Sequence, residues 1–188
     1  MNIGVHSLWP TLLLEANYGE KFQSSIDDII DKVEFIPAPS HWGKTHSLSK
    51  PANYETAEDQ YVALFEDDVI SRYGLEDLHT EIDNLAKEFC NLYGLRYGKY
   101  KRTSWFTLFE KGNYAHVHNH MCASISGCFY YKTNGNDGNI FFKTPLPQIS
   151  SSPAYAGAPT RHAVQVTNGK MILFPGWLDH GVMTNETD

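Results

Sequence analysis

Three histidines have the residue type and the spacing expected of ligands to one metal ion. His118 and His120 are separated by a single residue, and His180 comes much later in the chain. Alternate residues of a β-strand point to the same face, so both imidazoles of a His-x-His pair can reach one ion. The third ligand must then come from elsewhere in the fold. The sequence therefore predicts a three-histidine metal site.

The surroundings of His180 support this prediction. The run Met171–Phe174 reads as an apolar strand, and it is interrupted by Pro175 and Gly176 shortly before His180. Gly181 follows directly, and a residue this small leaves space for a ligand. The alternative is that His118 and His120 belong to a solvated edge strand that carries a chance histidine repeat.

Four further residues are candidates for the surroundings of the metal. His116 has the same parity as His118 and could face the substrate or the solvent. We assign Trp105 and Trp177 to a substrate pocket, with packing in the core as the alternative for a tryptophan. Asp179 is the carboxylate next to His180, and it could be a fourth ligand or simply solvated.

Two helices are expected in the first half of the chain. Apolar residues recur at helical spacing from Gln23 to Val33, and more strongly from Leu75 to Leu92. Gly94 lies where a C-terminal glycine would end the second helix. The stretch from Pro37 to Asn53 has no period and is expected to be a loop.

After Gly94 the sequence becomes rich in β-branched and aromatic residues with short turns, which is typical of an all-β sandwich or barrel. The expected strands are Ser104–Phe109, His116–Met121, Ile125–Lys132, Asn139–Lys143, Ala163–Thr167, Met171–Phe174 and Gly181–Thr184. We expect one domain over residues 1–188, of the α+β class but mainly β. Residues 1–95 would hold an N-terminal strand and buttressing helices, and residues 96–188 a jelly-roll core.

Composition excludes several classes of function. The chain has 188 residues, 22 acidic against 15 basic side chains, and a net charge of −7. Without a cluster of Lys and Arg, nucleic acid is not an expected partner. No run of about 18 apolar residues and no signal peptide is seen, so we expect neither membrane insertion nor secretion. The three cysteines do not form a disulfide pattern, and they favour a reducing compartment such as the cytosol.

These motifs together resemble those of the iron(II)- and 2-oxoglutarate-dependent oxygenases, over roughly residues 100 to 185. The resemblance rests on Trp105, on the His-x-His pair, on the Ser-Gly-x-x-Tyr strand from Ser126 to Tyr130, and on the run from Leu173 to Val182 with its Phe-Pro and His180. Within that superfamily the sequence is similar to a prolyl-hydroxylase-like branch, whose members occur in bacteria and in viruses of marine cyanobacteria. The cytosol of a bacterium or of a virus-infected host is therefore the expected location.

The resemblance implies a double-stranded β-helix, cupin-like, that holds one iron. His118 matches the first ligand, His120 the second and His180 the distal histidine. The cofactors implied are Fe(II), 2-oxoglutarate and O2. Ser126 and Tyr130 have one parity on their strand, and the hydroxyl of Tyr130 could donate to a carboxylate of 2-oxoglutarate or simply pack as a strand aromatic.

The sequence departs from the family pattern in two respects. Most relatives have a carboxylate where His120 stands, and three imidazoles also suit Zn or another divalent metal. The family normally follows the distal histidine with a strand whose Arg pairs with 2-oxoglutarate, but this sequence ends at Asp188. We expect that Arg on a strand beyond the given sequence, with Arg161 or Arg102 as substitutes.

The expected function is therefore that of an oxygenase that hydroxylates an unactivated C–H bond. The substrate would be a prolyl or other peptide residue, or a small molecule; the sequence does not indicate an oligomeric state. Two alternatives remain: another cupin-like metalloenzyme, either a three-histidine dioxygenase or a zinc hydrolase, and a metal-binding module without catalysis.

Overall fold

The computed structural model describes residues 4, 10–42, 45–146, 148, 153, 157 and 159–188. Its helices are α1 (Gln23–Ile30), α2 (Gln60–Glu66), α3 (Val69–Arg72) and α4 (Glu76–Tyr93), with a 3-10 turn η1 (Ser40–Trp42). Its strands are β1 (Leu14–Asn17), β2 (Phe35–Pro37), β3 (Ser47–Ser49), β4 (Thr107–Leu108), β5 (Ala115–His118), β6 (Ile125–Phe129), β7 (Ile140–Lys143), β8 (Arg161–Val164), β9 (Lys170–Pro175) and β10 (His180–Val182).

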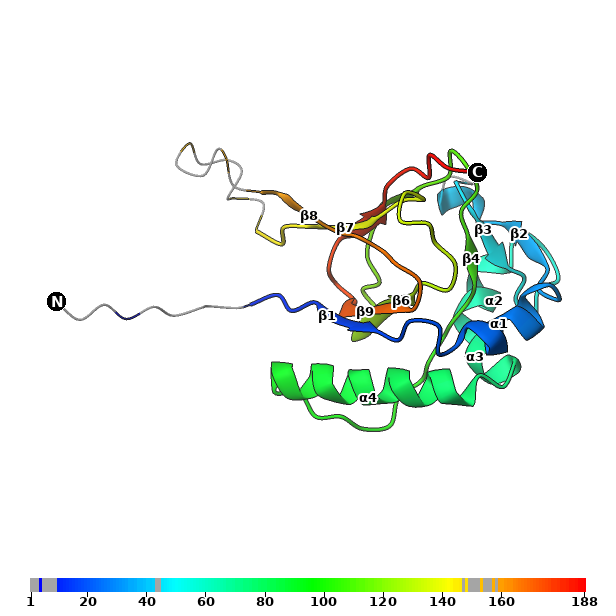
Figure 1. Cartoon of the computed structure of the whole chain (residues 1–188), viewed down its shortest axis with the longest axis horizontal. Helices are drawn as coiled ribbons and strands as arrows, with labels where there is room; N and C mark the ends of the chain where they lie inside the picture. Colours follow the sequence, from blue (N-terminus) through cyan, green and yellow to red (C-terminus); the bar gives the residue numbers. More distant parts are fainter. Residues whose placement is uncertain are drawn as a thin grey trace.

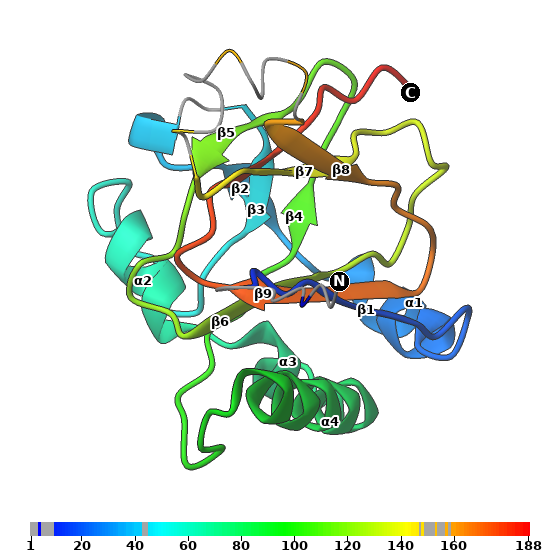
Figure 2. The same cartoon turned by 90° about the vertical axis from the view of Figure 1, so that its left-hand side faces the viewer.

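The strands form three antiparallel sheets. Their orders are β1-β9-β6, β5-β10-β7-β8 and β2-β3-β4. The first two sheets lie one above the other, and the small third sheet closes one end of the space between them (Figure 1). Figure 2 shows the same arrangement from the side, with α3 and α4 beneath the β1-β9-β6 sheet.

Two apolar clusters hold these layers together. One lies between the two larger sheets and is built around Ile172 and Phe174 of β9 and Ile140 and Phe142 of β7. The other lies between the β1-β9-β6 sheet and the helices, where Met171 meets side chains of α1, α3 and α4. Because successive residues of β9 point to opposite faces, Met171 and Ile172 are fully buried in different clusters.

The long helix α4 confirms the prediction from its periodicity. Leu78 and Phe89 are buried on its inner face, and Glu76 and Asp77 occupy the first turn, where a carboxylate favours the helix dipole. The helix ends at Gly94, which has φ 67° in the left-handed region. α1, in contrast, ends at Ile30, three residues earlier than its apolar pattern predicts.

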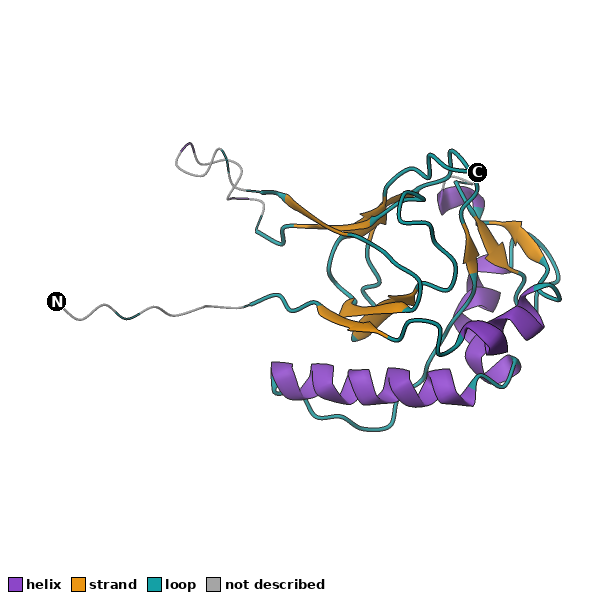
Figure 3. Cartoon of the chain, viewed as in Figure 1, coloured by secondary structure: helices purple, strands orange, loops and turns teal. Residues whose placement is uncertain are grey.

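Several predicted boundaries differ from the structure. The expected loop from Pro37 to Asn53 contains η1 and β3, and β3 pairs with β2 on one side and β4 on the other. β8 begins at Arg161, two residues before the predicted start at Ala163. Figure 3 shows helices below and to the right of the two larger sheets, with the β2-β3-β4 sheet among them, so the fold is a mixed one with antiparallel sheets. Among the described residues, none of the helices is long and apolar enough to cross a membrane.

Candidate metal centre

Two of the three histidines come from neighbouring strands. His118 is the last residue of β5 and His180 the first of β10, and the antiparallel pairing places them directly opposite each other. Directly paired residues point to the same face of a sheet, and the two ring centroids are 4.4 Å apart. The sheet register itself therefore brings these two imidazoles together.

His120 is positioned by a turn instead of by the strand. β5 ends at His118, so the prediction of a strand continuing to Met121 is wrong. The amide of His120 donates to the carbonyl of Gly176 (2.7 Å), and its own carbonyl accepts from the amide of Ala123 (2.8 Å). Its ring centroid nevertheless lies 5.1 Å from those of both other histidines.

Gly176 permits this close approach of two loops. A Cβ at this position would lie 2.0 Å from the carbonyl oxygen of Ala123 and 2.7 Å from that of His120. Both atoms belong to backbone and cannot rotate away. A glycine is therefore required where the turn that carries His120 crosses the end of β9.

In His118 and His180, a hydrogen bond engages one ring nitrogen and leaves the other free. Nδ1 of His118 lies 2.7 Å from the carbonyl oxygen of His116, and Nδ1 of His180 lies 2.9 Å from that of Leu178. A carbonyl can only accept, so each Nδ1 carries the proton and Nε2 keeps its lone pair. Metal-binding histidines are commonly oriented in this way. The candidate ligand atoms of all three rings lie within 4.8 Å of one another.

The rings also have the protonation state that a metal ligand needs. Burial, followed by the proximity of His118, lowers the pKa of His120 to about 4. Burial also lowers the pKa of His180 to about 4, against the opposing effect of its hydrogen bond to Leu178. Both imidazoles are therefore neutral at pH 7, and neutral imidazole is the form that binds metals.

A second layer of contacts surrounds the histidines. Phe174 packs against His180 with ring centroids 4.7 Å apart, and Trp105 lies 6.5 Å from His120. The side-chain amide of Asn119 donates to the carboxylate of Asp179 (2.8 Å). This bond joins the segment with the first two histidines to the segment with the third. The carboxylate of Asp179 is thus engaged beside the cluster, and the structure does not group it with the three rings.

The other predicted site residues lie at different distances from the histidine cluster. Trp105 is near the cluster, and Trp177, 46% exposed, follows the glycine that contacts His120. His116 is exposed and packs edge-on against Tyr114, with ring centroids 4.9 Å apart. It is thus not grouped with the other three histidines.

Ser126 lies in β6, and Tyr130 comes directly after this strand, which ends at Phe129 and not at the predicted Lys132. Ser126 pairs with Phe174, and Tyr130 packs against the cluster between the two larger sheets. Burial, with Cys128 beside it, raises the pKa of Tyr130. The Tyr130 hydroxyl therefore stays protonated and is a hydrogen-bond donor over the whole physiological pH range.

The two arginines considered above are engaged elsewhere. Arg161 stacks over the ring of Phe141, 4.9 Å from its centroid, on the face of β8 opposite to His162. Arg102 binds the carboxylate of Asp68 through two nitrogens, at 2.8 Å and 3.1 Å. The structure brings neither guanidinium to the three histidines.

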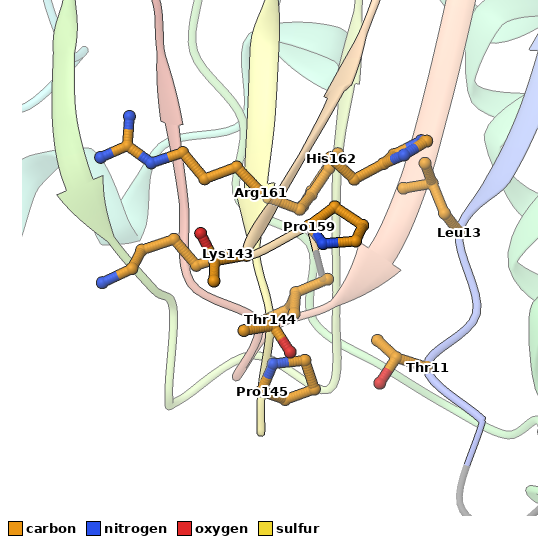
Figure 4. Close-up of a pocket in the computed structure, with 11 residues that line it drawn as sticks. Thr11, Leu13, Lys143, Thr144, Pro145, Pro159, Arg161 and His162 are labelled. Carbon is orange, nitrogen blue, oxygen red and sulfur yellow. The ribbon is translucent and has the colours of Figure 1, made fainter. Parts of the chain in front are cut away.

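A cavity of about 240 Å³ lies against β7 and β8, and none of the three histidines lines it directly. Phe142 and Leu178 line it, and both also contact His180, through its ring and its Nδ1. Figure 4 shows that Leu13 and His162 extend to one side of this hairpin, whereas Lys143 and Arg161 extend to the other. The lining of the cavity therefore combines apolar side chains, such as Leu13, Phe142 and Leu178, with polar ones, such as Thr144 and His162.

Sequence reasoning missed three contributors to this site. In the sequence Gly176 only interrupts a strand, Asn119 only separates two histidines, and His46, which stacks on Phe109 (5.0 Å), falls in a predicted loop. Of these, Asn119 carried a signal, because it separates two candidate ligands.

Comparison with known proteins agrees with this geometry. Residues 103–188 match a family model described as "Putative 2OG-Fe(II) oxygenase". Among solved structures, the chain is similar to a Pseudomonas putida prolyl-4-hydroxylase, with a TM-score of 0.53 and 14% sequence identity. The match covers 94% of this chain and 88% of that one, and at this identity it is a likeness of fold. No curated protein matches the chain. The part of this chain that holds all three histidines is thus similar to the 2OG-Fe(II) oxygenase family.

Proposed function

We propose that this protein is an iron(II)- and 2-oxoglutarate-dependent hydroxylase whose iron is held by His118, His120 and His180. The observation that carries the proposal is the convergence of three imidazoles, two of which have Nδ1 bonded to a carbonyl and Nε2 free. Imidazole nitrogens bind such metals at about 2.1 Å, so small ring rotations suffice to place all three on one ion. The donor set therefore fits the metal.

We further propose that the two larger sheets form a double-stranded β-helix and that 2-oxoglutarate lies between them. The hydroxyl of Tyr130 would donate a hydrogen bond to a carboxylate of this cosubstrate, and Ser126 would help to hold the same carboxylate. Arg161 receives less support for this role, because its guanidinium packs on Phe141. The bound metal and cosubstrate supply the oxidising chemistry. The chain orients them and excludes water through the apolar side chains of Phe142 and Phe174.

The substrate is proposed to be a peptide residue, with proline as the first candidate. The solved structure similar to this one is a prolyl-4-hydroxylase, which supports this choice. A small molecule is the alternative, and the cavity of about 240 Å³ against β7 and β8 would admit a side chain or a compact molecule.

An anaerobic titration tests the metal and cosubstrate. Iron(II) added with 2-oxoglutarate should give visible charge-transfer absorption, and admission of O2 should yield succinate. The His180→Ala variant should lose both signals, whereas a change at the exposed Leu92, 55% accessible on α4, should keep them. Absence of the absorption band in the unaltered chain would exclude the proposal.

One observation favours a second candidate. No carboxylate belongs to the histidine cluster in the described part of the chain, and three histidines with an open position are also a zinc-catalytic arrangement. A zinc hydrolase or a three-histidine dioxygenase would fit. Metal analysis after anaerobic, reducing purification separates the two, because stoichiometric zinc that iron cannot displace would support the second candidate.

A further inference from the structure

A group of aromatic side chains, here called the aromatic wall, lies beside the metal centre. It consists of His41, Trp42, His46, Tyr61, Phe65 and Trp105. Trp42 is at its centre, with ring centroids 6.2 Å from Tyr61 and 6.4 Å from Trp105. The wall is assembled from η1, the residue before β3, helix α2 and the segment before β4.

The aromatic wall is continuous with the histidine cluster. Trp105 contacts Trp42 on one side and His120 on the other, the latter at 6.5 Å between ring centroids. The amide of Tyr114, just before β5, donates to the carbonyl of Thr45 (3.2 Å) and ties the wall to the strand that carries His118. A molecule lying on the wall would therefore extend to the metal.

The wall is not a buried core. Ala38, Leu48 and Leu64 form the apolar cluster beneath it and are almost inaccessible to solvent. Every member of the wall, in contrast, is at least partly exposed, and Tyr61 is 44% exposed. Rings that only closed a small core would not need to remain so accessible.

Three polar groups of the wall are free to bind a partner, whereas Nδ1 of His46 lies 3.2 Å from the hydroxyl of Thr45. Within the described chain, the indole nitrogens of Trp42 and Trp105 and the hydroxyl of Tyr61 make no hydrogen bond. None of these three rings has a Lys or Arg over its face in the same part of the chain. The wall thus offers unused donors and unused ring faces.

Carboxylates border the wall. Helix α2 carries Tyr61 and Phe65, and it is preceded by Glu55 and Glu58 and ends at Glu66. These three glutamates are exposed, and none forms an ion pair within the residues described. A surface of aromatic faces next to free carboxylates attracts cations.

We infer that the aromatic wall is the docking surface for the substrate, and that this substrate is an extended peptide with Lys or Arg close to the residue that reaches the metal. The inference rests on the proposed function. Extended peptides leave backbone carbonyls unpaired, and the indole and phenol donors of the wall would bind them. The cationic side chains would lie over the rings of Tyr61 or Trp42 and near the glutamates of α2.

Nuclear magnetic resonance of the indole N–H groups provides the test. The probe is a ten-residue Pro/Ala peptide with three Lys, compared with the same peptide carrying Gln, added to the full chain loaded with Zn(II) as a diamagnetic ion. The chain has four tryptophans, so each indole signal can be assigned by single Trp→Phe variants. The Lys peptide should shift the signals of Trp42 and Trp105 and bind several-fold more tightly than the Gln peptide at low salt.

Variants of Tyr61 separate recognition from packing. Tyr61→Leu keeps an apolar side chain but removes the π face, and it should weaken binding of the Lys peptide about threefold. Tyr61→Phe keeps the face and should bind nearly as well as the unaltered chain, and Leu92→Ala on α4 is the exposed control. Equal binding of the Lys and Gln peptides, or shifts confined to Trp177, would overturn the inference.

Failure of the two proposals can be told apart. The charge-transfer absorption of iron(II) with 2-oxoglutarate is measured without peptide and reports only on the proposed function. If that absorption forms and the Lys peptide does not bind, the docking surface is wrong. If the peptide binds on the wall but the absorption never forms, the proposed function is wrong.

Discussion

Replacing Gly176 by Ala is expected to loosen metal binding without unfolding the protein. The added Cβ would lie 2.0 Å from the carbonyl oxygen of Ala123, whereas real contacts of this type are never shorter than about 3.0 Å. The turn must therefore move by about 1 Å or more. That turn carries His120, which also donates its amide to Gly176 (2.7 Å).

The size of the effect follows from this displacement. Overpacking of a tight contact costs about 1–3 kcal/mol of stability. A shift of the groups that orient a metal ligand typically costs about 10–100-fold in metal affinity. We expect losses in these ranges for Gly176→Ala, because His118 and His180 remain fixed by their strands while His120 moves.

Two other glycines provide matched controls. A Cβ at Gly98 would meet no atom within 4 Å, so Gly98→Ala should change neither stability nor affinity. A Cβ at Gly127, in the middle of β6, would lie 2.6 Å from the carbonyl oxygen of Ile172, away from the metal centre. Gly127→Ala should therefore lower stability but preserve the metal affinity of the molecules that remain folded.

Anaerobic titration of Fe(II) or Co(II) against a coloured chelator measures the affinity, and thermal melting followed by circular dichroism measures the stability. The reasoning is refuted if Gly176→Ala binds metal as tightly as Gly98→Ala. It is also refuted if Gly127→Ala loses affinity to the same extent, because the loss would then reflect general destabilisation.

Three further predictions concern the same residues and one distant ion pair. Asn119→Ala and Asp179→Ala should each weaken metal binding. The double variant should bind metal no more weakly than either single variant, because both changes remove the same 2.8 Å hydrogen bond. A chelator titration of the unaltered chain, the two single variants and the double variant measures this. The metal-free chain should lose stability as the pH falls from about 6.5 to about 4. In this range His120 and His180 take up protons in the unfolded state, whereas in the folded state burial lowers the pKa of both to about 4 and they remain neutral. Urea unfolding across this pH range measures the loss, and added metal should make it steeper. Burial alone would raise the pKa of Asp68, but its hydrogen bonds to an arginine and two serines lower it to about 2. Asp68→Asn should therefore cost about 1–2 kcal/mol at pH 7, and the difference should vanish as the pH falls from about 4 to about 2.

Local signals in the sequence were enough to predict α4. Its apolar residues recur regularly over five turns, and Gly94 supplies the left-handed residue that ends it. β3 carries no such signal. Its three residues, Ser47–Ser49, become a strand only because β2 and β4 pair with it from both sides. Tertiary pairing of this kind cannot be deduced from three residues.

The sequence predicts the three-histidine cluster, but the structure brings the rings together partly in another way than predicted. His118 and His180 meet because their strands pair in register, which strand alternation alone does not indicate. His120 was placed by the same alternation, yet the strand has already ended there, and a turn anchored on Gly176 brings the ring to the cluster. The aromatic wall was missed except for Trp105, because its members come from separate segments that lack periodicity.

The three histidines are supported in different ways, which bears on how easily each ligand position could accept another side chain. His118 and His180 are fixed by a ladder of strands, and a change in either position would disturb the whole sheet. His120 is fixed by two backbone hydrogen bonds of a turn, so its Cα can adjust to a longer or shorter side chain at a smaller cost in packing. Exchange of ligand type, and with it the charge at the metal, is therefore easiest at this position. Imidazole ligands carry no charge when they bind a metal, so three of them would leave a bound ion more positive than a site with one carboxylate would.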